Sequence, residues 1–141
     1  MSTILKGLSI FKGLTDKDFE KIESIIEEKK FSDGHVLFRQ GEDTDAFYII
    51  KEGSVRIVVH QDGAEKQLAV LGSGEFFGEM GVIENSPRMA DALISGDTIL
   101  LEIEKHEFHQ FMALNPTISM KIMSTMVQRY KVKPSADEVA L

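Results

Sequence analysis

One stretch of the sequence combines an arginine, a carboxylate and closely spaced glycines in a pattern that suits an anionic ligand. Glu79 and Arg88 are nine residues apart, and Gly78 and Gly81 flank the carboxylate. A guanidinium binds phosphate oxygens through two parallel hydrogen bonds, and free backbone N–H groups at the start of a short helix attract anions. A carboxylate beside them can accept a hydrogen bond from a sugar hydroxyl. The pattern therefore suggests a ribose phosphate, although the same residues also fit a turn with a surface ion pair between Glu79 and Arg88.

The other candidate metal-binding and catalytic residues form weaker patterns. His106 and His109 would share one face of a helix, with Glu102 and Glu104 just before them, but no third ligand with metal-site spacing follows. We interpret both histidines as solvated side chains. The chain contains no cysteine, which excludes disulfides and thiolate chemistry, and no serine stands in a recognisable nucleophile turn. The sequence predicts a binding protein with no catalytic residues, no metal and no cofactor.

Short apolar runs separated by glycines predict the sheet that positions this segment. Between Phe31 and Glu104 glycines recur every few residues, and Asp62-Gly63 is a hairpin signal. We predict an antiparallel β-roll or jelly-roll barrel of about eight strands over residues 30–104. The apolar runs include Val36-Leu37-Phe38, Phe47-Tyr48-Ile49-Ile50, Val55-Arg56-Ile57-Val58-Val59, Leu68-Ala69-Val70-Leu71 and Ile99-Leu100-Leu101-Glu102-Ile103.

Helical periodicity brackets the predicted barrel on both sides. Thr15 to Asp18 form a capping-type start, and the apolar residues after it predict a helix that ends near Lys29. After Lys105 the Asn115-Pro116 pair divides a second helical region, residues 105–133, into two helices. The fold class is therefore α+β: one domain over residues 1–133, with an N-terminal helix, a barrel and two C-terminal helices, followed by a tail over 134–141. The apolar helix positions are Phe19, Ile22, Ile25 and Ile26 in the first helix, and Phe108, Phe111, Met112, Ile118, Ile122 and Met126 in the last two.

The length of the chain and its net charge exclude several classes of protein. The chain has 141 residues, enough for one domain with a real core. It carries 16 Lys and Arg residues against 23 Asp and Glu residues, a net charge of −7, which makes it a poor general binder of nucleic acid. No run of ~18 apolar residues predicts a membrane span, and the N-terminus lacks a signal-peptide pattern. With the lack of cysteine, these features predict a cytoplasmic protein.

The glycine-rich segment resembles the phosphate-binding cassette of the cyclic-nucleotide-binding domain family, which includes catabolite activator proteins and regulatory subunits of protein kinase A. The matching residues are Phe77-Gly78-Glu79, Gly81, Val82-Ile83 and Pro87-Arg88. A second element of the family is similar to the upstream run from Val36 to Glu42, followed by Phe47 to Ile50 and Gly53. The resemblance covers residues 8–133, and two motifs in the right order make it specific.

The resemblance implies a role for each matched residue. Arg88 would bind the exocyclic phosphate of a cyclic mononucleotide, and Glu79 would accept the ribose 2′-hydroxyl. The ligand would be cAMP in preference to cGMP, because Met89 lacks the hydroxyl that other members use to favour guanine; cGMP stays open as a second ligand. Residues of the C-terminal helix would lie near the base. The complete predicted site is Phe77, Gly78, Glu79, Met80, Gly81, Pro87, Arg88, Met89 and Ala90, with Arg129, Tyr130 and Lys133 from the helix.

The sequence departs from the family pattern at three positions, and two of them, Met89 and Asp91, favour an alternative function. Met89 is long enough to crowd the pocket, and Asp91 places an acid close to the phosphate site, where like charge weakens anion binding. Thr44 replaces a smaller residue, and we expect it to affect a loop and not the pocket. The alternative is a degenerate domain that binds no nucleotide and serves as an interaction or dimerisation module.

The last predicted helix carries more apolar residues than one contact face requires. Ile118, Ile122 and Met126 form one stripe, and a second stripe lies beside it. We hypothesise a homodimer through this helix; the alternative is that the second stripe packs on the preceding helix, residues 108–114. Related regulators continue into a helix-turn-helix domain, so for a chain that stops at Leu141 we expect no direct nucleic-acid binding, and the regulated protein is unidentified. The second stripe consists of Met120, Met123, Val127 and Tyr130.

Overall fold

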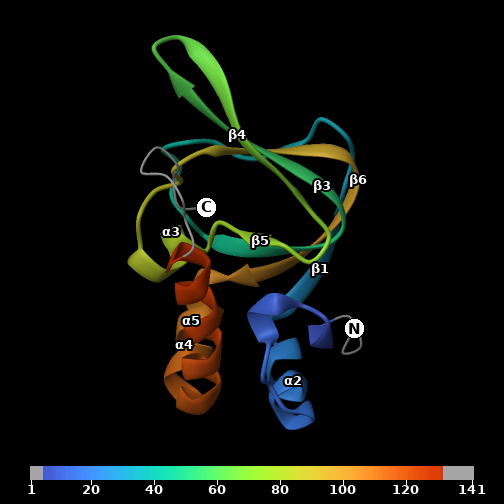
Figure 1. Ribbon diagram of the computed structural model, residues 1–141, viewed down its shortest axis with the longest axis vertical. Helices are drawn as coiled ribbons and strands as arrows, with labels where there is room; N and C mark the ends of the chain where they lie inside the picture. Colours follow the sequence, from blue (N-terminus) through green and yellow to red (C-terminus); the bar gives the residue numbers. More distant parts are fainter. Residues whose placement is uncertain (1–4, 132–141) are drawn as a thin grey trace.

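The computed structural model describes residues 5–131, and in Figure 1 a curved sheet lies above a group of helices. Helices α2, α4 and α5 lie together on one side of the sheet, and the short helix α3 lies against its edge. Among the described residues, no helix has the length and apolar character needed to cross a membrane. In chain order the elements are η1 (Ser9–Phe11), α2 (Asp16–Glu23), β1 (Ile26–Phe31), β2 (Val36–Phe38), β3 (Ala46–Gln61), β4 (Ala64–Gly72), β5 (Phe76–Phe77), α3 (Glu79–Glu84), β6 (Asp91–Glu104), α4 (Lys105–Leu114) and α5 (Pro116–Lys131).

The sheet is antiparallel throughout, and two long strands form its centre. Its strand order is β1-β6-β3-β4, with β2 paired to β6 and β5 paired to β3. Strands β3 and β6 run alongside each other from Ala46 opposite Glu104 to Val58 opposite Asp91. Because of this pairing, the start of β6, which directly follows the cassette, lies next to the other central strand, β3. The predicted α+β class with an antiparallel β-roll is confirmed, and the sheet is not closed.

The described chain has six strands where about eight were predicted from the spacing of glycines. The register of β3 against β6 shifts between Ile50 and Ser54, and Gly53 adopts a φ of 105° within the same strand. A Cβ at Gly53 would meet the Asp97 carbonyl oxygen at 2.7 Å, so the glycine allows two segments to approach closely. The chain therefore continues as one irregular strand where the sequence suggested two strands and a turn.

The first helix is shorter than its periodicity predicted. The capping box at Thr15 is present, with the Asp18 N–H donating to the Thr15 hydroxyl at 3.2 Å, but α2 ends at Glu23. Ile26 to Phe31 form strand β1, which pairs with β6 from Ile103 to Thr98. The predicted extension to Lys29 is wrong because pairing satisfies the backbone groups along the open edge of β6, and this outweighs the helix propensity of Glu and Lys.

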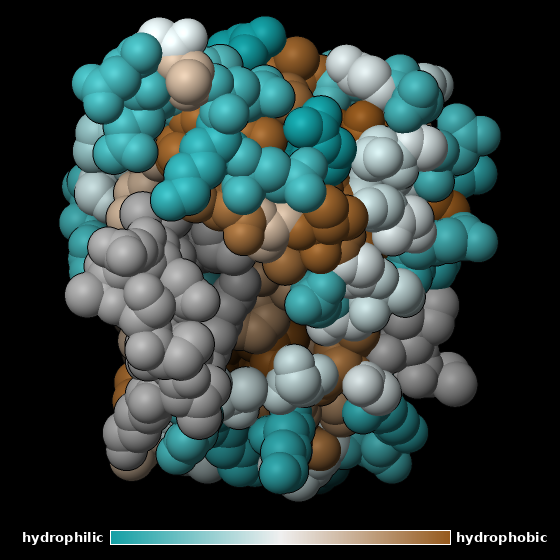
Figure 2. Space-filling view, turned by 45° about the horizontal axis from the view of Figure 1, so that its top comes forward, coloured by the Kyte–Doolittle hydropathy of each residue, from teal (hydrophilic) through white to brown (hydrophobic). Residues whose placement is uncertain are grey.

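The buried core has two parts, one between the sheet and the helices and one inside the curve of the sheet. The first includes Phe47, Phe108 and Ile122, with the Phe47 and Phe108 rings in an edge-to-face contact at 4.9 Å. The second includes Ile57 and Phe77 and lies beside the cassette. In the face seen in Figure 2, apolar residues gather in and above a recess near the middle of the molecule. The sheet thus carries a helix-packing core on one side and a lining for a pocket on the other.

Candidate functional site

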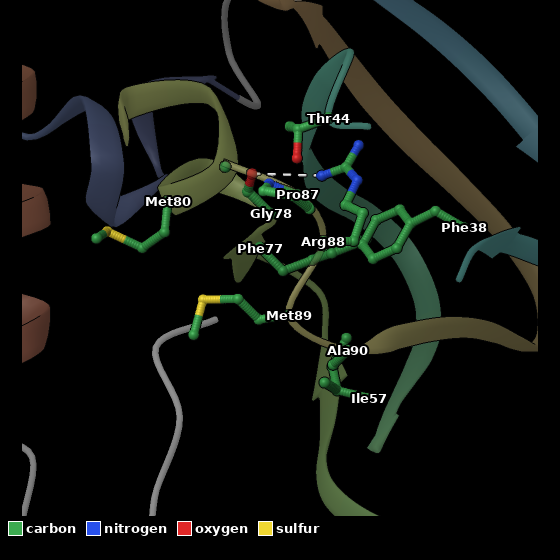
Figure 3. A pocket seen from close by; sticks show the side chains of 11 residues that line it. Phe38, Thr44, Ile57, Phe77, Gly78, Met80, Pro87, Arg88, Met89 and Ala90 are labelled. Atoms are coloured by element: carbon green, nitrogen blue, oxygen red, sulfur yellow. Dashed lines mark hydrogen bonds between the residues drawn. The ribbon is translucent and has the colours of Figure 1, made fainter. Parts of the chain in front are cut away.

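The cassette and the segment after β2 enclose a pocket of about 360 Å³ that opens to solvent. This empty volume includes space open to solvent, and the part that water molecules can occupy is about 30 Å³. Figure 3 shows its side chains, which come from β2, the segment after it, β3, β5, α3 and the turns on either side of α3. The pocket is lined by Phe38, Thr44, Ile57, Phe77, Gly78, Met80, Gly81, Pro87, Arg88, Met89 and Ala90.

Gly78 forms a sharp turn at the start of the cassette, where the backbone passes close to the Arg88 side chain. Its φ is 81°, in the left-handed region, at the residue that precedes α3. A Cβ at this position would stand 2.7 Å from Nη1 of Arg88, so any other residue would displace the guanidinium. Both the backbone conformation and the close approach therefore require glycine.

The Arg88 guanidinium is buried and held from several sides. Its side chain is 3% exposed, Nη2 donates to the Ala46 carbonyl oxygen at 2.7 Å, and Nη1 donates more weakly to the Gly78 carbonyl oxygen at 3.4 Å. Nη2 also lies 3.3 Å from the carboxylate of Asp45, a side chain that is 85% exposed. Burial lowers the pKa of the guanidinium, although arginine keeps its proton in proteins.

The electrostatics around Arg88 favour an anion. Its close neighbours include neutral carbonyl groups, and the Asp45 carboxylate is mostly solvated, so the positive charge is only partly compensated. The Nε atom is buried and, among the described residues, has no hydrogen-bond partner. A buried donor without a partner is costly, and a ligand oxygen would relieve that cost.

The segment between β2 and β3 holds the cassette in place through backbone hydrogen bonds. The Gly41 N–H donates to the Arg88 carbonyl oxygen at 2.9 Å, and the Arg88 N–H donates to the Glu42 carbonyl oxygen at 2.8 Å. The Thr44 hydroxyl donates to the Ser86 carbonyl oxygen at 2.7 Å. The second sequence motif therefore has a structural role, because it fixes the backbone on both sides of the Arg88 side chain.

Thr44 lies in the pocket, which corrects the expectation that it affects only a loop. It is 4% exposed, and its side chain contributes to the pocket wall (Figure 3). A Cβ at Gly81 would overlap the Thr44 side chain. The larger residue at position 44 is accommodated because position 81 has no side chain.

Glu79 is fully buried at the start of α3, between two residues that line the pocket. Gly78 and Met80 are lining residues, whereas Glu79 is not one of them. Its predicted contact with a sugar hydroxyl stays a prediction, which an experiment below tests.

Asp91 is compensated by neighbours of its own and is not a lining residue of the pocket. Its buried carboxylate accepts hydrogen bonds from the Gln40 N–H at 2.7 Å, from Arg39 at 3.1 Å and from His60 at 3.0 Å. Burial raises the pKa of Asp91, but these hydrogen bonds and the Arg39 charge outweigh burial, so its pKa lies below the ordinary value. The expected repulsion of a phosphate is therefore offset by the two cationic or donor side chains that surround the carboxylate.

The structure brings most of the predicted site together and adds three residues. Of the predicted residues, Phe77, Gly78, Met80, Gly81, Pro87, Arg88, Met89 and Ala90 line the pocket. Phe38, Thr44 and Ile57 line it as well and were missed; Phe38 lies within the second motif, residues 36–42, which was the one available signal. Arg129 and Tyr130 belong to α5, but their side chains are outside the described part of the chain, and Lys133 lies outside the described residues altogether.

The two histidines considered as metal ligands make other contacts. His109 Nε2 lies 2.7 Å from the Val82 carbonyl oxygen, and the His106 N–H donates to the Glu104 carboxylate at the start of α4. Within residues 5–131, no group of three or more His, Asp or Glu side chains is arranged to hold a metal ion.

A helix-capped antiparallel β-roll, with a buried arginine facing a glycine turn, has a pocket that suits a small anionic ligand. The family model for the cyclic nucleotide-binding domain matches residues 28–115. The chain therefore belongs to the cyclic nucleotide-binding domain family, as the two sequence motifs indicated. That match includes the cassette and every residue that lines the pocket.

Curated relatives include both regulators and kinases. The cyclic AMP receptor protein of Thermus thermophilus is 29% identical over 128 residues, which cover 90% of this chain and 59% of that protein. A cGMP-dependent protein kinase of Drosophila melanogaster is 34% identical over 116 residues, which cover 79% of this chain and 12% of the kinase. The chain thus spans well under two thirds of the length of these relatives.

Solved structures agree on the fold. The regulatory domain of Toxoplasma gondii protein kinase A with cAMP is similar with a TM-score of 0.72 and 29% identity, over 78% of this chain and 42% of that one. The regulatory subunit of a cAMP-independent protein kinase A from Trypanosoma brucei has a TM-score of 0.79 and 22% identity, over 94% of this chain and 46% of that one. At 22% identity the second likeness concerns the fold alone.

Proposed function

We propose that this chain binds a 3′,5′-cyclic mononucleotide in the pocket beside Arg88, with cAMP preferred over cGMP, and acts by ligand binding without catalysis. The observation that carries the proposal is the buried Arg88 guanidinium at the pocket wall, whose Nε has no hydrogen-bond partner within residues 5–131 and whose charge is only partly compensated. An anionic phosphate fits this place, and charge-assisted hydrogen bonds are the strong ones. The names of the Thermus receptor and the Toxoplasma complex support cAMP as the ligand class.

The apolar part of the lining supports a base next to the phosphate. Ile57, Met80 and Met89 provide aliphatic and thioether surface, and Met89 is 40% exposed. Methionine packs well against aromatic rings and adapts to their shape. No hydroxyl stands at position 89 to pair with guanine, which is the reason for the proposed preference.

Calorimetric titration with cAMP and cGMP tests the preference directly. We expect cAMP to bind about tenfold more tightly than cGMP, which corresponds to the net value of about one hydrogen bond. The variant Met89→Thr adds a hydroxyl and should narrow the difference by raising the affinity for cGMP, while Met89→Val serves as the matched control without a hydroxyl.

Equal affinities for the two nucleotides in the parent chain would remove the preference. The absence of binding by either nucleotide would favour the alternative, a domain that serves as an interaction module. Met89, which is 40% exposed at the pocket, is the observation that favours this alternative.

We further propose that ligand binding is transmitted through the C-terminal helices. Helix α4 contacts the C-terminal half of α3 at two points: His109 at the Val82 carbonyl oxygen, and Lys105 Nζ at the Asn85 side chain at 3.1 Å. Asn85 ends α3 in the left-handed conformation, so a shift of the cassette changes the position of both contacts. Helix α4 leads directly into α5, which would carry the change to a regulated protein in the proposed cytoplasmic location.

The exposed side of α5 supports the proposed homodimer. The stripe of Ile118, Ile122 and Met126 is buried in the chain's own core, and Met123 also packs against this core. Met120 and Val127 are 75% and 46% exposed, so they are the apolar residues available to a second copy.

Sedimentation at several protein concentrations, with and without cAMP, tests the dimer. We expect a concentration-dependent dimer in the parent chain and a monomer for Met120→Lys combined with Val127→Lys, because two charges would be buried in the interface. Val70→Lys, at an exposed apolar position on β4, is the matched control and should still dimerise. A parent chain that sediments as a monomer throughout would end the dimer proposal.

A further inference from the structure

The Phe38 ring lies directly against the Arg88 guanidinium. The guanidinium carbon of Arg88 is 3.8 Å from the centroid of the Phe38 ring, whereas the Tyr48 ring is 6.0 Å away (Figure 3 shows the Phe38 contact). The attraction between a cation and the face of an aromatic ring strengthens when water is excluded. Arg88 is buried, so this contact lies in the range where the attraction is largest.

Other aromatic rings hold the Phe38 ring in its place. Its centroid is 6.3 Å from that of Tyr48, with an angle of 29° between the rings, and 6.1 Å from that of Phe77, at 42°. Phe38 also pairs with Ala92 of β6, four residues after Arg88 along the chain. The ring that contacts the guanidinium is therefore fixed by the sheet and by the strand that continues from the cassette.

Stacking uses the face of a guanidinium and leaves its N–H groups free at the edge. Nη2 already donates to the Ala46 carbonyl oxygen, while the buried Nε has no partner among the described residues. A ring that holds the face also sets the direction of these edge donors. We propose that Phe38 is a positioning residue, which orients Arg88 so that its edge meets the ligand phosphate. This inference rests on the proposed binding of a cyclic nucleotide.

Two substitutions at position 38 and one control test the proposal by calorimetry with cAMP. Phe38→Leu removes the ring but keeps an apolar side chain, and we expect a loss of affinity of about 3- to 30-fold. Phe38→Tyr keeps the ring and should stay within about twofold of the parent chain. Phe31→Leu is the matched control, because Phe31 packs against the same core cluster at a place away from Arg88, and it should also stay within about twofold.

A second measurement reports on the contact without any ligand. In the NMR spectrum of the free protein, the Arg88 side-chain protons should be shifted upfield by the ring current of Phe38, and Phe38→Leu should remove this shift while Phe38→Tyr keeps it. A merely structural role for the ring would not produce this pattern together with an affinity loss confined to position 38.

The outcomes separate this inference from the proposed function. Failure of the parent chain to bind any cyclic nucleotide would overturn the proposed function, and the role of Phe38 with it, even where the NMR shift is present. Binding by the parent with an unchanged affinity in Phe38→Leu would overturn the positioning role alone. An equal loss in Phe38→Leu and Phe31→Leu would also overturn it, because general loosening of the core would then explain the effect.

Discussion

Arg88→Leu should abolish measurable binding of cAMP while the domain still folds. The guanidinium is the buried cation at the pocket wall, and each charge-assisted hydrogen bond to a phosphate is worth about 1.5–3 kcal/mol. Loss of two such bonds corresponds to an affinity lower by roughly 10²- to 10⁴-fold. Calorimetric titration of the parent and the variant with cAMP measures this directly.

Two further variants make the Arg88 result specific. Arg56→Leu removes the same charge at a site on β3, where Arg56 contacts Gln67 and Glu65, and should leave cAMP affinity unchanged. Arg88→Lys keeps the charge without the planar fork and should retain part of the affinity. Thermal unfolding followed by circular dichroism checks the fold, because the leucine variant leaves the Ala46 carbonyl oxygen without its donor. A folded Arg88→Leu protein that binds cAMP as tightly as the parent would disprove the assignment of the cassette.

Glu79→Ala should weaken the binding of cAMP much more than the binding of its 2′-deoxy analogue. The carboxylate is fully buried between two lining residues, and the proposed acceptor role requires the 2′-hydroxyl, which the analogue lacks. A hydrogen bond to a charged acceptor is worth about 1.5–3 kcal/mol, so the affinity for cAMP should fall by roughly 10- to 150-fold. The affinity for the analogue should change by less than about threefold.

Glu79→Gln is the matched control for shape. It keeps the length of the side chain and a carbonyl acceptor, so it should retain more cAMP affinity than Glu79→Ala. Similar losses for cAMP and the 2′-deoxy analogue in Glu79→Ala would show that Glu79 supports the fold of α3 and does not contact the sugar.

The sequence by itself determined the family, the fold class and most of the pocket lining. Gly78 and Arg88 are local in this sense, because a sharp turn with a positive φ favours glycine and a guanidinium suits phosphate oxygens whatever surrounds them. Both belong to one short segment, ten residues apart, and the structure places them in contact, with the Arg88 Nη1 donating to the Gly78 carbonyl oxygen. The pattern of short predicted strands between predicted helices was likewise sufficient to predict the α+β class.

The tertiary structure decided everything that depends on residues distant along the chain. Phe38 and Thr44 lie in the pocket because β2 and the segment after it pack against the cassette, more than forty positions away in sequence. Asp91 is compensated because Arg39 and His60 reach it from two other segments. Residues 26–31 are a strand because β6 offers an open edge, and no helical periodicity reveals that edge. Local patterns encode which residues can do chemistry, whereas long-range packing sets the neighbours, burial and charge balance under which they do it.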